Sequence, residues 1–224
     1  MVDEYLSERE QADQLRAWIK ENWLWLVAGT VLGLGGVYGY RWWNAHQAAR
    51  SEVAEQQFSA MLDALGRNQR EEGLKIATKI TGEYADTPYA DQAQLVLARL
   101  DIEAGDLDAA AMALKKVMDG SRDPDLALVA RLRLARVQLA KGSYDDALAT
   151  LDGVKNAAVA ARVAELRGDV LLARGKPADA LASYRQAQSA VEQGKSDDGQ
   201  VDQEMLRLKI DELSATTAGN EGPG

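Results

Sequence analysis

One stretch near the start of the chain, residues 23–40, is apolar or glycine at nearly every position and contains no Asp, Glu, Lys or Arg. Its 18 residues would form an α-helix about 27 Å long, close to the thickness of the hydrocarbon core of a bilayer. Aromatic residues cluster at both ends, and Lys20 and Arg41 bracket the stretch, as expected at the two headgroup layers. The pattern predicts a transmembrane helix over 23–41.

A buried core helix and a cleaved signal peptide are the other interpretations of this stretch. A core helix would have no use for aromatic and basic residues gathered at its two ends. A signal peptide would begin with a short basic segment, whereas residues 1–22 hold more acids than bases. The nearest small-x-small sequence, 37–39, is followed directly by bulky residues and makes a poor cleavage site. We therefore expect a retained single-pass anchor.

The segment before the span, 1–22, is predicted to be a polar arm. Residues 7–10, Ser-Glu-Arg-Glu, match a capping box, so a helix is expected to begin there and run into the span. A solvated arm without regular structure is the alternative. Three Lys or Arg precede the charge-free stretch 23–40 and two, Arg41 and Arg50, follow it within twenty residues, which favours a cytoplasmic N-terminus by a margin of one.

Glycines form a stripe within the predicted span. Gly29, Gly33 and Gly36 share one helical face, and Gly39 lies next to them. Small residues spaced in this way let a second membrane helix approach closely. Because glycine is common in membrane helices in general, the stripe can also be without a partner. We favour a helix–helix contact, either with another protein or with a second copy of the chain.

Beyond the span the hydrophobic positions recur at helical spacing, and the segments repeat. The three turn glycines Gly105, Gly142 and Gly175 are 37 and 33 residues apart. A small residue precedes each of them, and a small and then a large residue follow, which resembles the tetratricopeptide pattern of antiparallel helix pairs. A step of 37 residues back from Gly105 puts Asn68 at a fourth turn, with Gly73 as its first small position. The fold predicted for 42–213 is an all-α stack of about four helical hairpins.

The end of the chain is predicted to close this stack. An amphipathic helix over 201–213, with Met205, Leu208 and Ile210, can cover the exposed last hairpin. A hydrophilic loop over 194–199 precedes it. Residues 214–224 are small and polar and end in Pro and Gly, so we expect them to be a disordered tail.

Composition excludes several classes of function. A net charge of −9 argues against a nucleic-acid partner, which needs a basic surface. The chain has no cysteine, so disulfides, thiolate metal sites and cysteine nucleophiles are excluded. Its single histidine, His46, has no partner motif for catalysis and is interpreted as a polar contact beside the membrane. With no phosphate-binding loop, nucleophile elbow or metal signature in the sequence, we expect neither an enzyme nor a cofactor.

The repeats are instead suited to binding. In stacked hairpins the first helices line a shared surface that can bind a peptide or a helix. Arg99, Arg136 and Asp169 occupy equivalent positions on these helices, and Leu95 and Leu132 lie one turn earlier. These five residues are our candidates for a binding groove. The alternative is that the arginines form a solvated helix face paired with nearby acids.

Several segments together resemble one bacterial family. The junction 41–47, Arg-Trp-Trp-Asn-Ala-His-Gln, the central repeat 132–138 with 147–152, the next repeat 163–175 and the ending 205–213 are similar to those of the YfgM family, the ancillary subunit of the Sec translocon. The resemblance covers nearly the whole chain. The loop 194–199 and the tail after Ser214 are longer than this family leads us to expect, which puts partner contacts at that end in doubt.

The resemblance implies a protein of the bacterial inner membrane, with its N-terminus in the cytoplasm and its repeats in the periplasm. It further implies a chaperone-adaptor role, with the SecYEG translocon, a PpiD-like periplasmic chaperone and emerging or unfolded exported proteins as partners, besides the lipid bilayer. The alternative function is regulation of envelope-stress signalling by sequestering a response factor.

Overall fold

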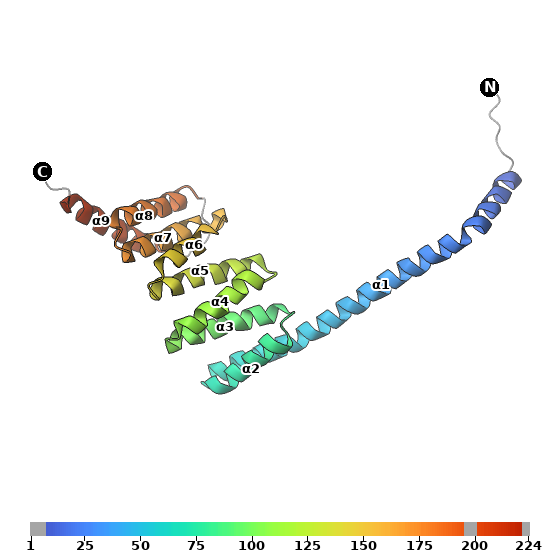
Figure 1. The fold of residues 1–224 in the computed structure, drawn as a ribbon, viewed down its shortest axis with the longest axis horizontal. Coiled ribbons are helices and arrows are strands. Elements are labelled where there is room, and N and C mark those ends of the chain that lie inside the picture. The colour runs from blue at the N-terminus through green and yellow to red at the C-terminus, as the bar shows by residue number, and fades with distance from the viewer. Residues whose placement is uncertain (1–7, 195–200, 221–224) are drawn as a thin grey trace, which may run out of the picture. The chain divides into compact units, whose positions relative to one another are not determined.

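The computed structural model describes residues 8–194 and 201–220, and every regular element within these ranges is helical (Figure 1). The all-α prediction is therefore confirmed. Most of the loop predicted over 194–199 lies outside the described residues. The elements are α1 (Glu8–Gly66), α2 (Arg70–Glu83), α3 (Pro88–Ala104), α4 (Leu107–Gly120), α5 (Pro124–Ala140), α6 (Tyr144–Asp152), η1 (Ala157–Val159), α7 (Ala160–Ala173), α8 (Pro177–Glu192) and α9 (Gln203–Asn220).

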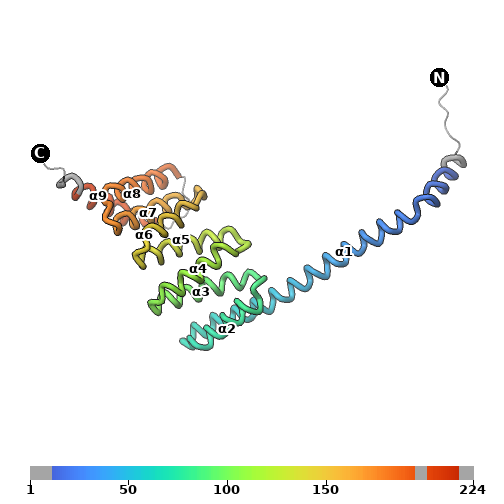
Figure 2. The backbone as a smooth tube through the Cα atoms, viewed as in Figure 1, coloured from blue at the N-terminus to red at the C-terminus, as the bar shows by residue number. Residues whose placement is uncertain are grey.

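The chain divides into two units, Met1–Glu52 and Val53–Gly224. The described part of the first unit belongs to α1, which the tube of Figure 2 follows as one continuous helix. No break in this helix marks the predicted ends of the span, at 23 and 41, because a helix satisfies its own backbone hydrogen bonds whatever surrounds it. Among the described helices, α1 is the one long and apolar enough to cross a membrane, judged by length and composition.

The second unit is a row of antiparallel helix pairs. The end of α1 pairs with α2, α3 with α4, α5 with α6, and α7 with α8, while α9 packs on α8 (Figure 1). Each pair contributes to an apolar cluster with the next one; for example, Leu114 and Val117 of α4 are fully buried against Ala130 and Leu134 of α5. The prediction of four hairpins followed by a last helix is confirmed.

Left-handed residues make the turns of these hairpins, at the positions expected from the sequence. Gly105, Gly142 and Gly175 have φ of 79°, 76° and 81°. Asn68, at the turn of the degenerate first repeat, has φ of 63° and is the non-glycine residue with positive φ in the described chain. Asparagine tolerates this region better than most residues, which explains how the first repeat turns without glycine.

The small positions of the repeats are places where two helices cross closely. A Cβ atom on Gly168 of α7 would lie 2.4 Å from the Cε1 atom of Tyr184 in α8. A Cβ atom on Gly73 of α2 would lie 2.5 Å from Cδ2 of Leu65. Because real side-chain carbons do not approach so closely, glycine sets the distance between the helices of these pairs.

The last helix, α9, covers the final hairpin through a stripe that differs from the predicted one. Its buried residues at helical spacing are Leu206, Ile210 and Leu213, whereas Met205 and Leu208 are exposed. Only Ile210 of the three predicted residues is in the core. Apolar residues occur on more than one face of this helix, so the sequence pattern does not determine which face is buried.

The helix α9 also continues past the predicted end of the domain at Leu213 and reaches Asn220. Within the predicted tail, residues 214–220 continue α9, while 221–224 lie outside the described residues. The guanidinium of Arg185 in α8 donates a hydrogen bond to the hydroxyl oxygen of Ser214, at 3.3 Å, and the hydroxyl of Thr216 donates to the carbonyl oxygen of Glu212. Without a proline before position 223, nothing in the sequence stops the helix at 213.

Candidate functional site

The glycine stripe of α1 lies open in the single chain. Gly29, Gly33, Gly36 and Gly39 are all exposed, and a Cβ atom added at any of them would meet no atom within 4 Å. The hydroxyl of Thr30, which lies beside the first of these glycines, bonds to its own helix by donating to the carbonyl oxygen of Leu26 at 2.8 Å. The stripe is therefore a smooth surface without competing polar groups, which suits close contact with another helix.

His46, beside the predicted span, is exposed and stacks on the ring of Trp42, with ring centroids 5.7 Å apart. Among the described residues, no group of three or more His, Cys, Asp or Glu side chains could hold a metal ion.

The structure brings together two of the predicted groove residues, Arg136 of α5 and Asp169 of α7. Asp169, Glu165 and Arg162 of α7 all lie within electrostatic range of the Arg136 guanidinium. Desolvation, followed by the positive charge of Arg162, lowers the pKa of Arg136. The third predicted charge, Arg99 of α3, pairs instead with Glu103 of its own helix, at 2.9 Å between exposed side chains. For Arg99, therefore, the alternative interpretation holds, in which the arginine is part of a solvated helix face and pairs with a nearby acid.

A charge cluster joins α7 to α9 beside Arg136. The ammonium group of Lys209 in α9 lies 3.0 Å from a carboxylate oxygen of Glu165 and 2.8 Å from one of Asp169. The hydroxyl of Tyr184 in α8 donates to the same oxygen atom of Asp169, Oδ1, at 2.7 Å. The charges of Glu165 and Asp169 are thus partly neutralised by Lys209, and Asp169 also accepts from Tyr184. The electrostatic potential around Arg136 is therefore more positive than the sequence alone indicates.

Burial and bonding shift the pKa values of this cluster. Burial raises the pKa of the fully buried Tyr184, and the hydrogen bond to Asp169 raises it further. Burial by itself would lower the pKa of Lys209, but the hydrogen bonds and charges of Asp169 and Glu165 outweigh it, so that the pKa is raised. Lys209 therefore stays charged, and its ion pairs with Glu165 and Asp169 hold α9 against α7.

The two predicted groove leucines are part of the core. Leu95 is 8% exposed and packs among residues of α4 and α5, and Leu132 is 1% exposed and packs against Leu151 and Leu166. A bound partner could not reach either side chain, which corrects their assignment to the groove. The equivalent position in the next repeat is Glu165, whose side chain is 18% exposed and pairs with Lys209.

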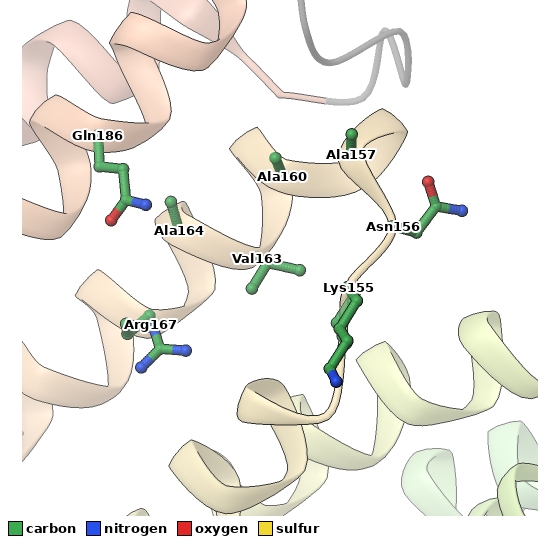
Figure 3. A pocket seen from close by; sticks show the side chains of 9 residues that line it. Lys155, Asn156, Ala157, Ala160, Val163, Ala164, Arg167 and Gln186 are labelled. Carbon is green, nitrogen blue, oxygen red and sulfur yellow. The ribbon is translucent and has the colours of Figure 1, made fainter.

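An open pocket of about 450 Å³ lies elsewhere on the repeats, between α7, the segment after α6, and α8 (Figure 3). Its α7 side carries Ala160, Val163 and Arg167, and Gln186 reaches toward it from α8. Lys155, on the segment that joins α6 to η1, lies at its rim. Sequence reasoning did not find this pocket. The sequence feature that could have indicated it is Gly153, because a glycine at this point ends the helical pattern earlier than in the equivalent helix α4.

The chain was compared with known protein families and solved structures. A family model described as a tetratricopeptide repeat-like domain matches residues 16–215. The solved structure "MamA RS-1 ArsTM double mutant" is similar in fold, with a TM-score of 0.51 and 20% identity over 73% of this chain and 96% of the other.

Curated relatives cover almost the whole chain. The protein of Escherichia coli (strain K12) named "Ancillary SecYEG translocon subunit" is 34% identical over 211 residues, which are 94% of this chain and 98% of the relative. The protein of the same name from Haemophilus influenzae is 31% identical over 93% of this chain and 98% of the relative, and that from Neisseria gonorrhoeae is 29% identical over the same shares. With these identities over nearly full lengths, and with a tetratricopeptide repeat-like domain over most of its residues, the chain belongs to the family of ancillary SecYEG translocon subunits, as the resemblance of its sequence led us to expect.

Proposed function

We propose that this protein is a non-enzymatic accessory subunit of the SecYEG translocon, held in the bacterial inner membrane by residues 23–41. The observation that carries the proposal is the charge-free stretch of α1, exposed over its length, in a chain that matches proteins named as translocon subunits along 98% of their own lengths. An exposed helix of this composition is unfavourable in water and favourable in lipid.

In this proposal residues 1–22 lie in the cytoplasm and the domain over 42–213 lies in the periplasm. Support comes from the basic residues on the two sides of the charge-free stretch 23–40, three before it and two after it. A reporter enzyme that is active only in the periplasm, fused after Gly224, tests this topology. Activity of the fusion is the expected result, and a cytoplasmic signal would reverse the assignment.

The repeats, in the same proposal, link the translocon to a periplasmic chaperone of the PpiD type and to emerging exported proteins. The surface we assign to this contact is the face of the first helices around Arg99, Arg136 and Asp169. Anchoring near the translocon raises the effective concentration of such a surface, so that even a weak site is occupied there.

The test of translocon association uses the full chain and two altered forms. In the first, residues 23–41 are replaced by an unrelated single membrane span, which keeps the anchor but removes its sequence. In the second, residues 47–224 are produced without an anchor. We expect SecYEG to co-purify with the full chain and to be largely lost from both altered forms. Undiminished recovery with the anchor-free form would refute a role for the span.

A further inference from the structure

The second helix of one hairpin, α6, is shorter than its counterpart in the preceding hairpin. α4 has 14 residues and α6 has 9, although both begin two residues after a turn glycine. In the 37-residue register, the last five residues of α4, 116–120, correspond to 153–157. This segment begins with Gly153 and contains Asn156, whose side chain accepts a hydrogen bond from the backbone N–H of Ala158 and starts η1. Glycine disfavours a continuing helix, and the asparagine cap begins a new one, so α6 ends at Asp152.

The missing turn has a structural consequence for α7. In the preceding hairpin, the end of α4 covers the first helix of the next pair: Val117 is fully buried in the cluster with α5, and Met118 packs against it. The counterpart of Val117 is Val154, which lies after the end of α6 and is only half-buried, although it still packs against the cluster of Leu132, Leu151 and Leu166. The start of α7, with Ala160 and Val163, is left as the floor of the open pocket in Figure 3.

The charged side chains that line this pocket are both basic. Lys155 is exposed at its rim, and Arg167 lies on its α7 side, 2.6 Å from Asp152. Arg131 of α5 lies beneath the same segment, in contact with Gly153. Because Arg167 is already paired with Asp152, the charge that this pocket offers to a partner is chiefly that of the exposed Lys155, which is complementary to an acidic group.

We propose that this pocket is a docking site for a short amphipathic helix of a partner protein, one that supplies the turn absent from α6. The inner face of the bound helix is apolar and lies against Ala160 and Val163, where small side chains allow close approach. Its flank is acidic and faces Lys155. The proposal uses only the packing of this chain and does not depend on association with SecYEG.

The first experiment identifies what the site selects. A phage library of random 12-residue peptides is panned on the full chain in lipid nanodiscs, and in parallel on Ala160→Trp, in which the pocket is filled. We expect the peptides that are lost on the filled variant to carry Asp or Glu beside apolar residues spaced three and four apart. If no peptide depends on the pocket, or if those that do are neutral or basic, the proposal is overturned.

The second experiment measures the affinity of one selected peptide by fluorescence anisotropy. Lys155→Glu, an exposed change that leaves the core intact, is expected to weaken binding by about tenfold or more. The matched control is Lys75→Glu, a lysine beside Ile76 on the surface of α2, which should leave the affinity unchanged. Thermal unfolding monitors the fold of each variant, and Ala157→Trp replaces Ala160→Trp if that variant is unstable. Equal affinity for the parent and Lys155→Glu would show that charge at this site does not select the partner.

Discussion

Gly168 and Tyr184 fix each other's position where α7 crosses α8. A Cβ atom on Gly168 would lie 2.4 Å from Cε1 and 2.5 Å from Cδ1 of the tyrosine ring. The ring cannot swing aside, because its hydroxyl is held at 2.7 Å by Asp169, the next residue along α7, and the side chain is fully buried. Gly168 thus packs against the edge of the ring, and its neighbour Asp169 accepts the hydrogen bond of the hydroxyl group.

From this contact we predict that Gly168→Ala lowers the free energy of unfolding by about 1–3 kcal/mol, the usual cost of overpacking a core. Alanine favours a helix over glycine by about 1 kcal/mol, but the steric clash outweighs that gain. Urea unfolding followed by circular dichroism measures the effect. The matched control is Gly82→Ala in α2, where a Cβ atom meets nothing within 4 Å and stability should be unchanged or slightly higher. Equal stability of the two variants would contradict the prediction.

Lys209 is predicted to matter more than an ordinary surface lysine. Lys209→Met leaves Glu165 and Asp169, whose side chains are only 18% and 30% exposed, without their shared cation. We expect a loss of about 2 kcal/mol, the scale of hydrogen bonds to charged groups in a partly buried site. Lys115→Met is the comparison, since its pair with Asp119 is more than half exposed on both sides and should contribute about 0.5 kcal/mol or less. If the two variants lose the same stability, the ion pairs of Lys209 contribute no more than an ordinary surface pair to the packing of α9.

The same cluster predicts a loss of stability in alkali. The pKa values of Tyr184 and Lys209 are both raised in the folded protein, from ordinary values of 10.0 and 10.5. A group with a raised folded-state pKa stabilises the fold fully below its unfolded pKa, and the contribution is lost as pH rises through the folded pKa. The urea midpoint should therefore fall from about pH 10 upward. The double variant Tyr184→Phe with Lys209→Met should show a shallower fall than the parent, and identical slopes would exclude these groups as its cause.

The features that the sequence predicted well are those set by residues close together along the chain. The turns at Gly105, Gly142 and Gly175 follow from the need for a left-handed residue at each hairpin, and Asn68 could be placed by the period alone. The span was recognisable because the absence of charge over 23–40 is a local property of composition.

The features that it did not predict depend on packing between distant segments. Lys209 bonds to residues 40 and 44 positions away, and no spacing rule connects them. Leu95 and Leu132 were assigned to the groove because the repeat register gives the position of a residue but not how far the neighbouring helix covers it. The faces of α9 and the pocket beside α6 were missed for the same reason: each depends on where another helix ends.

The turn glycines give a further prediction, which concerns backbone conformation. Gly142→Ala places a Cβ atom at φ of 76° without any clash, so its cost is conformational, about 1–2 kcal/mol. The control Gly120→Ala, at the end of α4, has equal space and no left-handed backbone, and we expect little change. Asn68→Gly should be neutral or slightly stabilising, because it relieves the same strain. Comparison of urea midpoints tests all three, and a stable Gly142→Ala variant would contradict the account of the turns.

The open stripe on α1 gives the last prediction, which separates folding from association. Gly33→Ile adds a branched side chain where nothing lies within 4 Å, so the repeats should unfold at the same temperature as those of the parent chain. If the stripe packs against a partner helix, the same change holds the two helices apart and should weaken co-purification with SecYEG by about tenfold, equivalent to about 1.4 kcal/mol. Leu34→Ile, the next residue along, keeps the hydrophobicity of the span and lies off the glycine stripe, so it should have no effect. Loss of association in Gly33→Ile alone would assign the contact to the stripe, since the added side chain makes the span more apolar and so does not weaken its insertion into lipid. Equal recovery from both would exclude the stripe as the contact with SecYEG, and a membrane-helix association reporter carrying 23–41 would then decide whether it pairs two copies of this chain.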